Sequence, residues 1–213
     1  MTTTSAGGKA FAEVIRERRS VRQYDPAFKL SDEDIRSLLA DAVLAPSSSN
    51  LQPWRFLVIR DDERKRLLLP IANNQKQVAE CSAVIAVLGD LDAYKQVESI
   101  YGRAVEAGHM PPEVKERMVE RTVAGYGGMS DERRRSIALI DGGLVSMQLM
   151  LAAKARGLDT VPMGGYNAEM FKEAFRVPDR YEPVMLIAVG KAAVEGRPTA
   201  RLRVDEVTFW DTF

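Results

Sequence analysis

Residues 45–54 read Ala-Pro-Ser-Ser-Ser-Asn-Leu-Gln-Pro-Trp and stand between two strongly patterned segments. Before them, Ser31 precedes three acidic residues, and apolar residues then recur at helical spacing through Val43, which predicts a helix from about Asp32. After them, Trp54–Ile59 is almost continuously apolar and predicts a buried strand. A connection rich in serine, asparagine and proline is ordinary for a loop, although its hydroxyl and amide groups would also suit the edge of a planar heterocycle. Taken alone, this stretch favours the loop interpretation.

Further elements are predicted on both sides of this connection. Two more apolar runs, Ala83–Leu88 and Val184–Val189, predict strands that are covered on both faces. Apolar residues at helical spacing near the start predict a first helix over about Lys9–Arg18. A long helix is predicted over Asp131–Arg156, and Gly157 stands where a glycine often follows the end of a helix.

Two adjacent glycines, Gly142 and Gly143, lie inside the predicted long helix. Each costs about 1 kcal/mol relative to alanine in a helix interior. A tolerated kink is the ordinary interpretation, and close approach of another backbone or of a flat ligand is the alternative. Farther along, Asn167 is suited to cap a short helix that ends near Arg176.

Two regions differ in composition from the rest of the chain. Leu91–Ser130 mixes glycines and prolines with charged helix formers, which predicts two helices and a mobile glycine-rich connection. Because it has few residues to build a core, we interpret it as a lid-like insertion at about 91–130 over a site. The tail at about 191–213 ends in an apolar cluster that a compact domain rarely leaves uncovered, and a partner subunit is one candidate cover.

Composition excludes several classes of protein. The 213 residues have room for one globular domain or at most two small ones. Thirty basic residues balance thirty acidic ones, so no overall charge attracts nucleic acid or membrane. With Cys81 and His109 as the single cysteine and histidine, neither a disulfide framework nor a thiolate or histidine metal site is expected. We expect Cys81 to be an inert core thiol and His109 a surface residue.

The sequence also favours a soluble, cytoplasmic protein. Residues 1–8 lack a basic region followed by an apolar stretch, so no targeting segment is expected. The longest uninterrupted apolar run, Ala83–Leu88, is too short to cross a bilayer.

Two more clusters have chemical potential. Residues 16–22 hold four arginines and one glutamate, a local net charge of +3 in a neutral chain. Guanidinium groups beside the Ser20 hydroxyl could hold a phosphate, although a basic helix end that complements the macrodipole is a slightly better explanation on spacing alone. In residues 161–166, two glycines could turn backbone N–H groups toward a ligand or could simply form a turn. The Gly-x-Gly-x-x-Gly dinucleotide fingerprint is absent.

Three segments in this order resemble the FMN-dependent nitroreductase family: Arg-Arg-Ser-Val-Arg at 18–22, Pro-Ser-Ser-Ser-Asn-Leu-Gln-Pro-Trp at 46–54, and Pro-Met-Gly-Gly-Tyr at 162–166. The resemblance extends from Phe11 to about Trp210. It implies one FMN-binding domain over residues 1–213 with an α+β fold, in which helices sandwich a mixed, mostly antiparallel sheet. It also implies an intertwined homodimer with FMN in clefts at the interface. The long helix would form much of the dimer seam, and the tail would wrap around the other subunit.

The resemblance also implies which residues hold FMN. Near the phosphate and ribityl chain these are Arg18, Arg19, Ser20, Arg22 and, from the tail, Arg201. Along the flavin ring they are Pro46, Ser47, Ser48 and Asn50 from the other subunit, together with Asn74, Gln77, Pro162, Met163, Gly164 and Gly165. Gly164 stands where many relatives carry a glutamate. Asp141 could reach the site from the long helix, and a buried structural carboxylate or a helix-surface charge is an equal alternative.

The chemistry that this resemblance implies is hydride transfer from NADH or NADPH through FMN to a nitroaromatic, a quinone or a related acceptor, by a ping-pong mechanism. No protein acid, base or metal is required, so no catalytic residue is assigned. The expected partners are a second copy of the chain and a small-molecule acceptor, without nucleic acid or membrane. One alternative is a flavoenzyme of the same fold with oxidase or dehydrogenase chemistry. Another is a flavin-free binding protein.

Overall fold

A four-stranded antiparallel sheet, in the order β1-β2-β4-β3, forms the centre of the protein. The computed structural model describes residues 10–213, so the expectations for residues 1–8 and for Lys9 lie outside the described residues. The strands are β1 (Trp54–Ile59), β2 (Ala83–Asp90), β3 (Asp159–Met163) and β4 (Tyr181–Gly190). A single parallel bridge joins Ser20 to Thr160. The predicted strands are therefore confirmed, as is the mixed, mostly antiparallel sheet.

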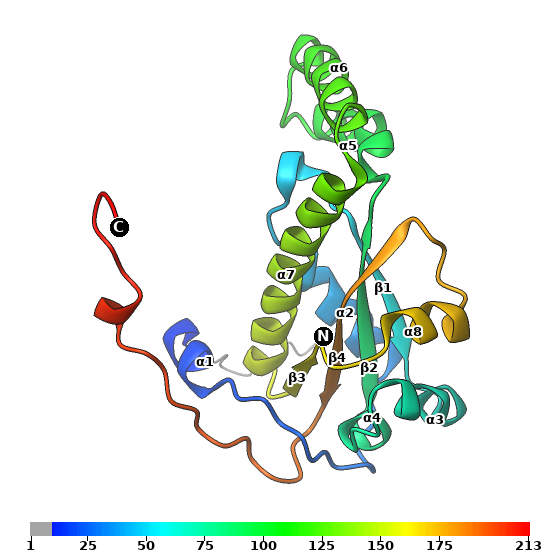
Figure 1. Cartoon of the computed structure of the whole chain (residues 1–213), viewed down its shortest axis with the longest axis vertical. Helices are drawn as coiled ribbons and strands as arrows, with labels where there is room; N and C mark the ends of the chain where they lie inside the picture. Colours follow the sequence, from blue (N-terminus) through cyan, green and yellow to red (C-terminus); the bar gives the residue numbers. More distant parts are fainter. Residues whose placement is uncertain (1–9) are drawn as a thin grey trace, which may run out of the picture.

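Helices cover both faces of this sheet (Figure 1). On one face, α2 (Asp32–Ala42) and α7 (Asp131–Ala155) pack against Ile85 and its neighbours on alternate positions of β2. On the other face, Val84 contributes to a second core with α3 (Asp62–Ile71), α4 (Gln77–Glu80) and α8 (Ala168–Phe175). Successive side chains of a strand point to opposite faces, so β2, buried along its whole length, serves both cores. This confirms the helix-sheet-helix sandwich. The edge strand β1 is covered less completely than predicted.

Most predicted helix limits agree with the structure. The first helix, α1, spans Phe11–Glu17. Ser31 and Asp34 form a reciprocal capping box at the start of α2, and Asn167 caps α8. Gly157 follows α7 with a φ of +74°, a left-handed conformation that favours glycine.

The two glycines in α7 have different surroundings. A Cβ atom at Gly142 would lie 2.7 Å from the Val184 side chain, so this glycine permits close packing of α7 on β4. A Cβ at Gly143 would meet nothing within 4 Å. Gly143 lies instead among the exposed apolar residues Ile140, Leu144 and Met147, on the side of α7 that faces away from the sheet. Close packing within the chain therefore explains the first glycine alone.

The segment at 91–130 contains the 3-10 helix η2 (Ala93–Gln96), α5 (Val97–Glu106) and α6 (Pro112–Gly127). The two predicted helices are present, and a short turn at 107–111 with Gly108 at a φ of +72° joins them. Gly125 and Gly127 lie inside α6 and not in a connection, and Gly128 caps that helix with its N–H on the Ala124 carbonyl. Because Ser130 already caps α7, little chain is left for a mobile link. The segment also has a small core of its own, centred on Tyr101 and closed by Leu51.

The C-terminal tail leads away from the sheet and ends far from it (Figure 1). Apart from the 3-10 helix η3 (Val204–Glu206), it is irregular, and Trp210 is 83% exposed. By length and composition alone α7 could cross a membrane. Its apolar residues are interrupted by polar ones, so the longest uninterrupted apolar run did not indicate this helix. Its buried side packs on the sheet, so we interpret it as a core helix whose outer apolar stripe lacks a cover within the described residues.

Candidate functional site

The basic run at 18–22 lies along the outer edge of β3. The Val21 N–H donates to the Thr160 carbonyl at 3.1 Å, beside the bridge between Ser20 and Thr160. Val21 is buried, so its neighbours Ser20 and Arg22 point to the other side of the extended chain. Neither Arg18 nor Arg22 forms an ion pair within residues 10–213. The segment therefore presents uncompensated positive charge beside a hydroxyl.

Arg19 has a different role from its neighbours. Its guanidinium donates to the Arg18 carbonyl at 2.9 Å and to the Arg16 carbonyl. A Cβ atom at Gly196 would lie only 2.4 Å from the Arg19 Cβ, so the start of the tail is closely packed on this residue. Arg19 thus holds the backbone of the basic run and the first part of the tail together.

The amide residues at 73–77 lie against the other end of β3. Asn73 Nδ2 and Gln75 Nε2 both donate to the Gly165 carbonyl, at 2.8 and 3.0 Å. Gln77 is buried, and its Nε2 donates to Gln75 Oε1 at 2.9 Å and approaches Met163 Sδ at 3.5 Å. With its amide nitrogen engaged in this way, the Gln77 side chain can offer its carbonyl oxygen as an acceptor.

Three predicted groups are therefore brought together along one strand edge. The basic run meets β3 at Thr160, and the 73–77 segment meets it at Met163 and Gly165. Five residues of extended chain separate Thr160 from Gly165, or roughly 16 Å. Gly164 and Gly165 are exposed, and a Cβ at Gly164 would meet nothing within 4 Å. This edge can accommodate an elongated ligand that is anionic at one end and rich in hydrogen-bonding groups at the other.

The loop at 46–52 is held by Asp141 from α7. The Ser48 N–H lies 3.1 Å from both carboxylate oxygens of Asp141, and the Ser48 hydroxyl donates to Oδ1 at 3.1 Å. Asp141 is buried, and this burial raises its pKa against the opposing effect of the bonds from Ser48. The Ser47 hydroxyl accepts from the Gln52 N–H at 3.0 Å and keeps its own proton free to donate. Asp141 thus positions the loop as a buried structural carboxylate.

Two tyrosines of the 91–130 segment hold the tip of the same loop. The Tyr101 hydroxyl donates to the Ser49 carbonyl at 2.9 Å, and the Tyr126 hydroxyl lies 3.5 Å from Ser49 Oγ. Tyr101 is buried in the small core of that segment. Tyr101 therefore belongs to the core of its own segment and also holds the 46–52 loop.

Left-handed backbone conformations occur in both loops. Ser49, Asn50 and Gln52 have φ values of 51°, 51° and 48°, and Asn73 and Asn74 have values of 56° and 54°. Such residues persist where surrounding contacts hold them, and they are concentrated at functional sites. The asparagines of these loops are the sequence signal for left-handed backbone, because asparagine tolerates this conformation better than most residues.

The structure does not join these two groups of residues within one chain. The loop at 46–52 leads into β1, whereas the other predicted groups lie along β3. These strands are opposite edges of the sheet, three strand spacings or about 14 Å apart. The Arg201 guanidinium bonds only Thr199 and the Ala200 carbonyl among the described residues, so no contact joins it to the basic run. A complete site would need a second copy of the chain.

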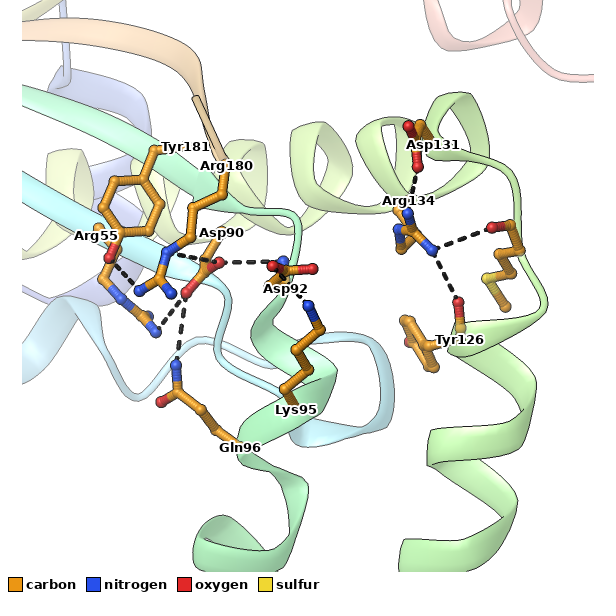
Figure 2. A network of polar contacts seen from close by, with 11 residues as sticks. Arg55, Asp90, Asp92, Lys95, Gln96, Tyr126, Asp131, Arg134, Arg180 and Tyr181 are labelled. Atoms are coloured by element: carbon orange, nitrogen blue, oxygen red, sulfur yellow. Dashed lines mark hydrogen bonds and ion pairs between the residues drawn. The ribbon is translucent and has the colours of Figure 1, made fainter. Parts of the chain in front are cut away.

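The 91–130 segment is fastened to the sheet at its first end and to α7 at its other end (Figure 2). At the first end, the Asp90 carboxylate is fully buried and accepts from Arg55 at 2.9 Å, with Arg180 at 3.7 Å and Gln96 Nε2 at 3.5 Å. At the other end, Arg134 donates to the carbonyls of Tyr126 and Met129 and pairs with Asp131. These contacts hold the helical insertion in one position over the 46–52 loop.

The structure gives no catalytic role to Cys81 or His109, the two other potentially reactive side chains. Cys81 is buried, which raises the pKa of its thiol to about 12 and leaves it protonated near neutral pH. His109 is exposed at the turn after α5. No group of three or more potential metal ligands occurs within residues 10–213.

Comparison with known proteins places this geometry in context. The model of the family described as "Nitroreductase family" matches residues 15–191. A Bacillus subtilis protein named "Putative NAD(P)H nitroreductase YdgI" is 50% identical over 202 residues, which cover 94% of this chain and 97% of that protein. The CLA biosynthesis enone reductase of Lactiplantibacillus plantarum is 33% identical, with 89% of each chain covered. A crystal structure of an Exiguobacterium sibiricum protein of this type, in complex with FMN, superposes with a TM-score of 0.92 at 48% identity and covers 95% of this chain and 98% of its own.

Proposed function

The chain belongs to the nitroreductase family, and from this premise we propose that it is an FMN-dependent oxidoreductase that passes hydride from NAD(P)H to a small organic acceptor. The observation that carries this proposal is the edge of β3, where unpaired guanidinium groups stand at one end and amide groups at the other. We infer that it acts in the cytoplasm as a homodimer.

The chemistry of the basic run fits the phosphate end of FMN. Arg18 and Arg22 have no carboxylate partner in the described part of the chain, and the Ser20 hydroxyl lies between them in sequence. Guanidinium groups bind phosphate through charge-assisted, often bidentate hydrogen bonds. We propose that Arg201 of the tail completes this clamp, and that Arg19 supports it through the backbone.

The groups at the other end of β3 fit a polar ring edge. The Gln77 carbonyl oxygen can accept a hydrogen bond, and Asn74, three residues earlier in the sequence, is exposed. The open space over Gly164 allows a flat ligand to approach the backbone from Pro162 to Gly165. These are the residues that would hold the flavin ring.

The loop at 46–52 would complete the site from the other subunit. The Ser47 hydroxyl can still donate a hydrogen bond, whereas the Ser48 hydroxyl uses its one donor on Asp141 and can only accept from a ligand. Pro46 and Asn50 are exposed on the same loop. We propose that the outer stripe of α7, which includes Gly143, forms the dimer seam, because its apolar residues otherwise face water.

FMN, when bound, supplies the two-electron chemistry. The residues of this chain bind and orient it, and none needs to act as acid or base. We infer a ping-pong order because nicotinamide and acceptor would use the same cleft in turn. The lid-like insertion at 91–130 would govern acceptor choice among nitroaromatics, quinones and, given the similarity to an enone reductase, α,β-unsaturated ketones.

The visible spectrum of the purified protein tests this proposal most directly. We expect a flavin spectrum that bleaches under anaerobic conditions when NADH or NADPH is added and returns when a quinone follows. Parallel double-reciprocal plots would support the ping-pong order. A bound flavin that neither nucleotide reduces would favour the oxidase or dehydrogenase alternative. A colourless protein that also rejects added FMN would contradict the proposal.

The tail provides a separate test of the dimer. Deleting Val207–Phe213 removes exposed aromatic surface, including Phe209 and Trp210, without touching the sheet. We expect sedimentation equilibrium to show a weaker dimer. An unchanged association constant would remove the tail from the interface.

A further inference from the structure

A groove of about 630 Å³ lies between α5 and the stretch at 50–55, which is the end of the 46–52 loop and the start of β1. Polar side chains on its wall come from both sides and are Asn50, Gln52, Arg55, Gln96, Arg103 and His109. Asn50 and Gln52 belong to the loop that we assign to the flavin site. The groove therefore borders that loop, and α5 of the lid-like insertion forms its other wall.

The charge of this groove is positive. Arg55 is neutralised, because its guanidinium pairs with the buried Asp90 carboxylate and donates to the Trp54 carbonyl at 2.8 Å (Figure 2). Arg103 has no such partner: its side chain forms no ion pair or hydrogen bond within residues 10–213. The His109 side chain is equally unpaired in that part of the chain. No aspartate or glutamate is among the described residues that line the groove.

We propose that this groove binds a phosphate monoester carried by a ligand that docks on the flavin, with Arg103 as its main cationic contact. The planar fork of an arginine suits bidentate phosphate recognition. The amide nitrogens of Gln52 and Gln96 already donate to Asn50 and Asp90, so Arg103 is the free cationic donor of the groove. The inference rests on the proposed function, since it assigns the groove to that function's substrates. Two ligands carry this group: NADPH, on its adenosine ribose, and a phosphorylated acceptor such as free FMN.

The test uses the flavin-loaded, full-length protein and the variant Arg103→Gln. In one arm, KM is compared for NADPH and NADH with a neutral quinone as acceptor. In the other, KM is compared for free FMN and riboflavin as acceptors with NADH as donor. The matched control is Arg117→Gln, which removes an equal charge from α6, outside the groove.

We expect Arg103→Gln to raise KM by about fivefold to tenfold for the phosphate-bearing member of one pair, while its partner changes by less than about twofold. A selective effect on NADPH identifies the nicotinamide nucleotide as the source, and a selective effect on FMN identifies the acceptor. If both members of each pair change equally, or if Arg117→Gln has the same effect, the groove is not a phosphate site. Arg103 would then serve only as a cation in the last turn of α5.

A binding measurement separates this proposal from the proposed function. Calorimetry compares 2′-AMP with adenosine, which lacks the phosphate, on the wild type and on Arg103→Gln. A preference for 2′-AMP that the substitution abolishes would support the groove even if neither nucleotide reduced the flavin. A flavin that bleaches normally, combined with equal affinities for the two probes, would refute the groove and leave the proposed function intact.

Discussion

The two halves of the candidate site are built by different means. Along β3, the basic run is aligned by a backbone hydrogen bond, from the Val21 N–H to the Thr160 carbonyl, and the Gly165 carbonyl accepts from two amides at once. The loop at 46–52 has no strand beside it. It is held by the Asp141 carboxylate and by the hydroxyl of Tyr101, a residue of the lid-like insertion.

This difference has a functional consequence. A strand edge with duplicated hydrogen bonds is set by the sheet and tolerates the loss of one side chain. A loop with three left-handed residues depends on the few side chains that hold it. Because one of these comes from the insertion, we expect acceptor recognition and flavin contact to be coupled in this half and independent in the other.

The largest effect is expected from the edge half, where charge rather than geometry is lost. Arg22→Ala combined with Arg201→Ala removes two cations that we propose contact the FMN phosphate. Hydrogen bonds to charged groups contribute roughly 1.5–3 kcal/mol each, so FMN affinity should fall by about 100-fold or more. Fluorescence titration with FMN measures the loss.

Arg16→Gln is the matched control for this variant, because it removes a cation from α1 just before the basic run. Its FMN affinity should stay near that of the wild type. Stoichiometric flavin retained by the double variant would overturn the phosphate-clamp assignment.

A smaller effect is expected from the loop half. Tyr101→Phe leaves the ring in its core and removes the bond to Ser49, which costs about 1 kcal/mol. FMN affinity should fall severalfold and acceptor KM should change with it. Asn73→Gly removes one donor to Gly165 from the other half, keeps the positive φ, and leaves Gln75 in place.

The ratio of these two effects tests the comparison itself. We expect Asn73→Gly to change FMN affinity by less than about twofold, measured in the same titration. If it weakens binding as much as Tyr101→Phe does, the two halves do not differ in the way that their hydrogen bonds suggest.

The same contrast explains how much could be predicted from the sequence. Apolar runs and caps located β1, β2 and β4 and the helices α2, α7 and α8, because burial and capping leave local signals. The bond from Tyr101 to Ser49 joins residues 52 positions apart, and no local pattern reports it. Gly125 and Gly127 do not form the expected loop, because glycine only permits a loop. The neighbouring helix formers and the capping Gly128 N–H keep both residues in α6. The strand order places the 46–52 loop and β3 at opposite edges of the sheet, and local sequence patterns do not report strand order.

The smallest effect concerns Asp141 and depends on pH. Burial raises its pKa above the ordinary value of 3.8, so the folded protein holds this proton at pH values where the unfolded chain has released it. Stability from this group is fully present below the unfolded pKa and is lost as pH rises through the folded one. In Asp141→Asn the amide oxygen can still accept from the Ser48 N–H, and this titration is gone. The stability of the variant relative to the wild type should therefore increase from about pH 4 upward and level off above the folded pKa.

Denaturant unfolding at a series of pH values measures this difference, in which other titrating groups, including Asp34, cancel. A constant difference across the series would show that Asp141 has an ordinary pKa and that the loop is held without cost from a buried charge.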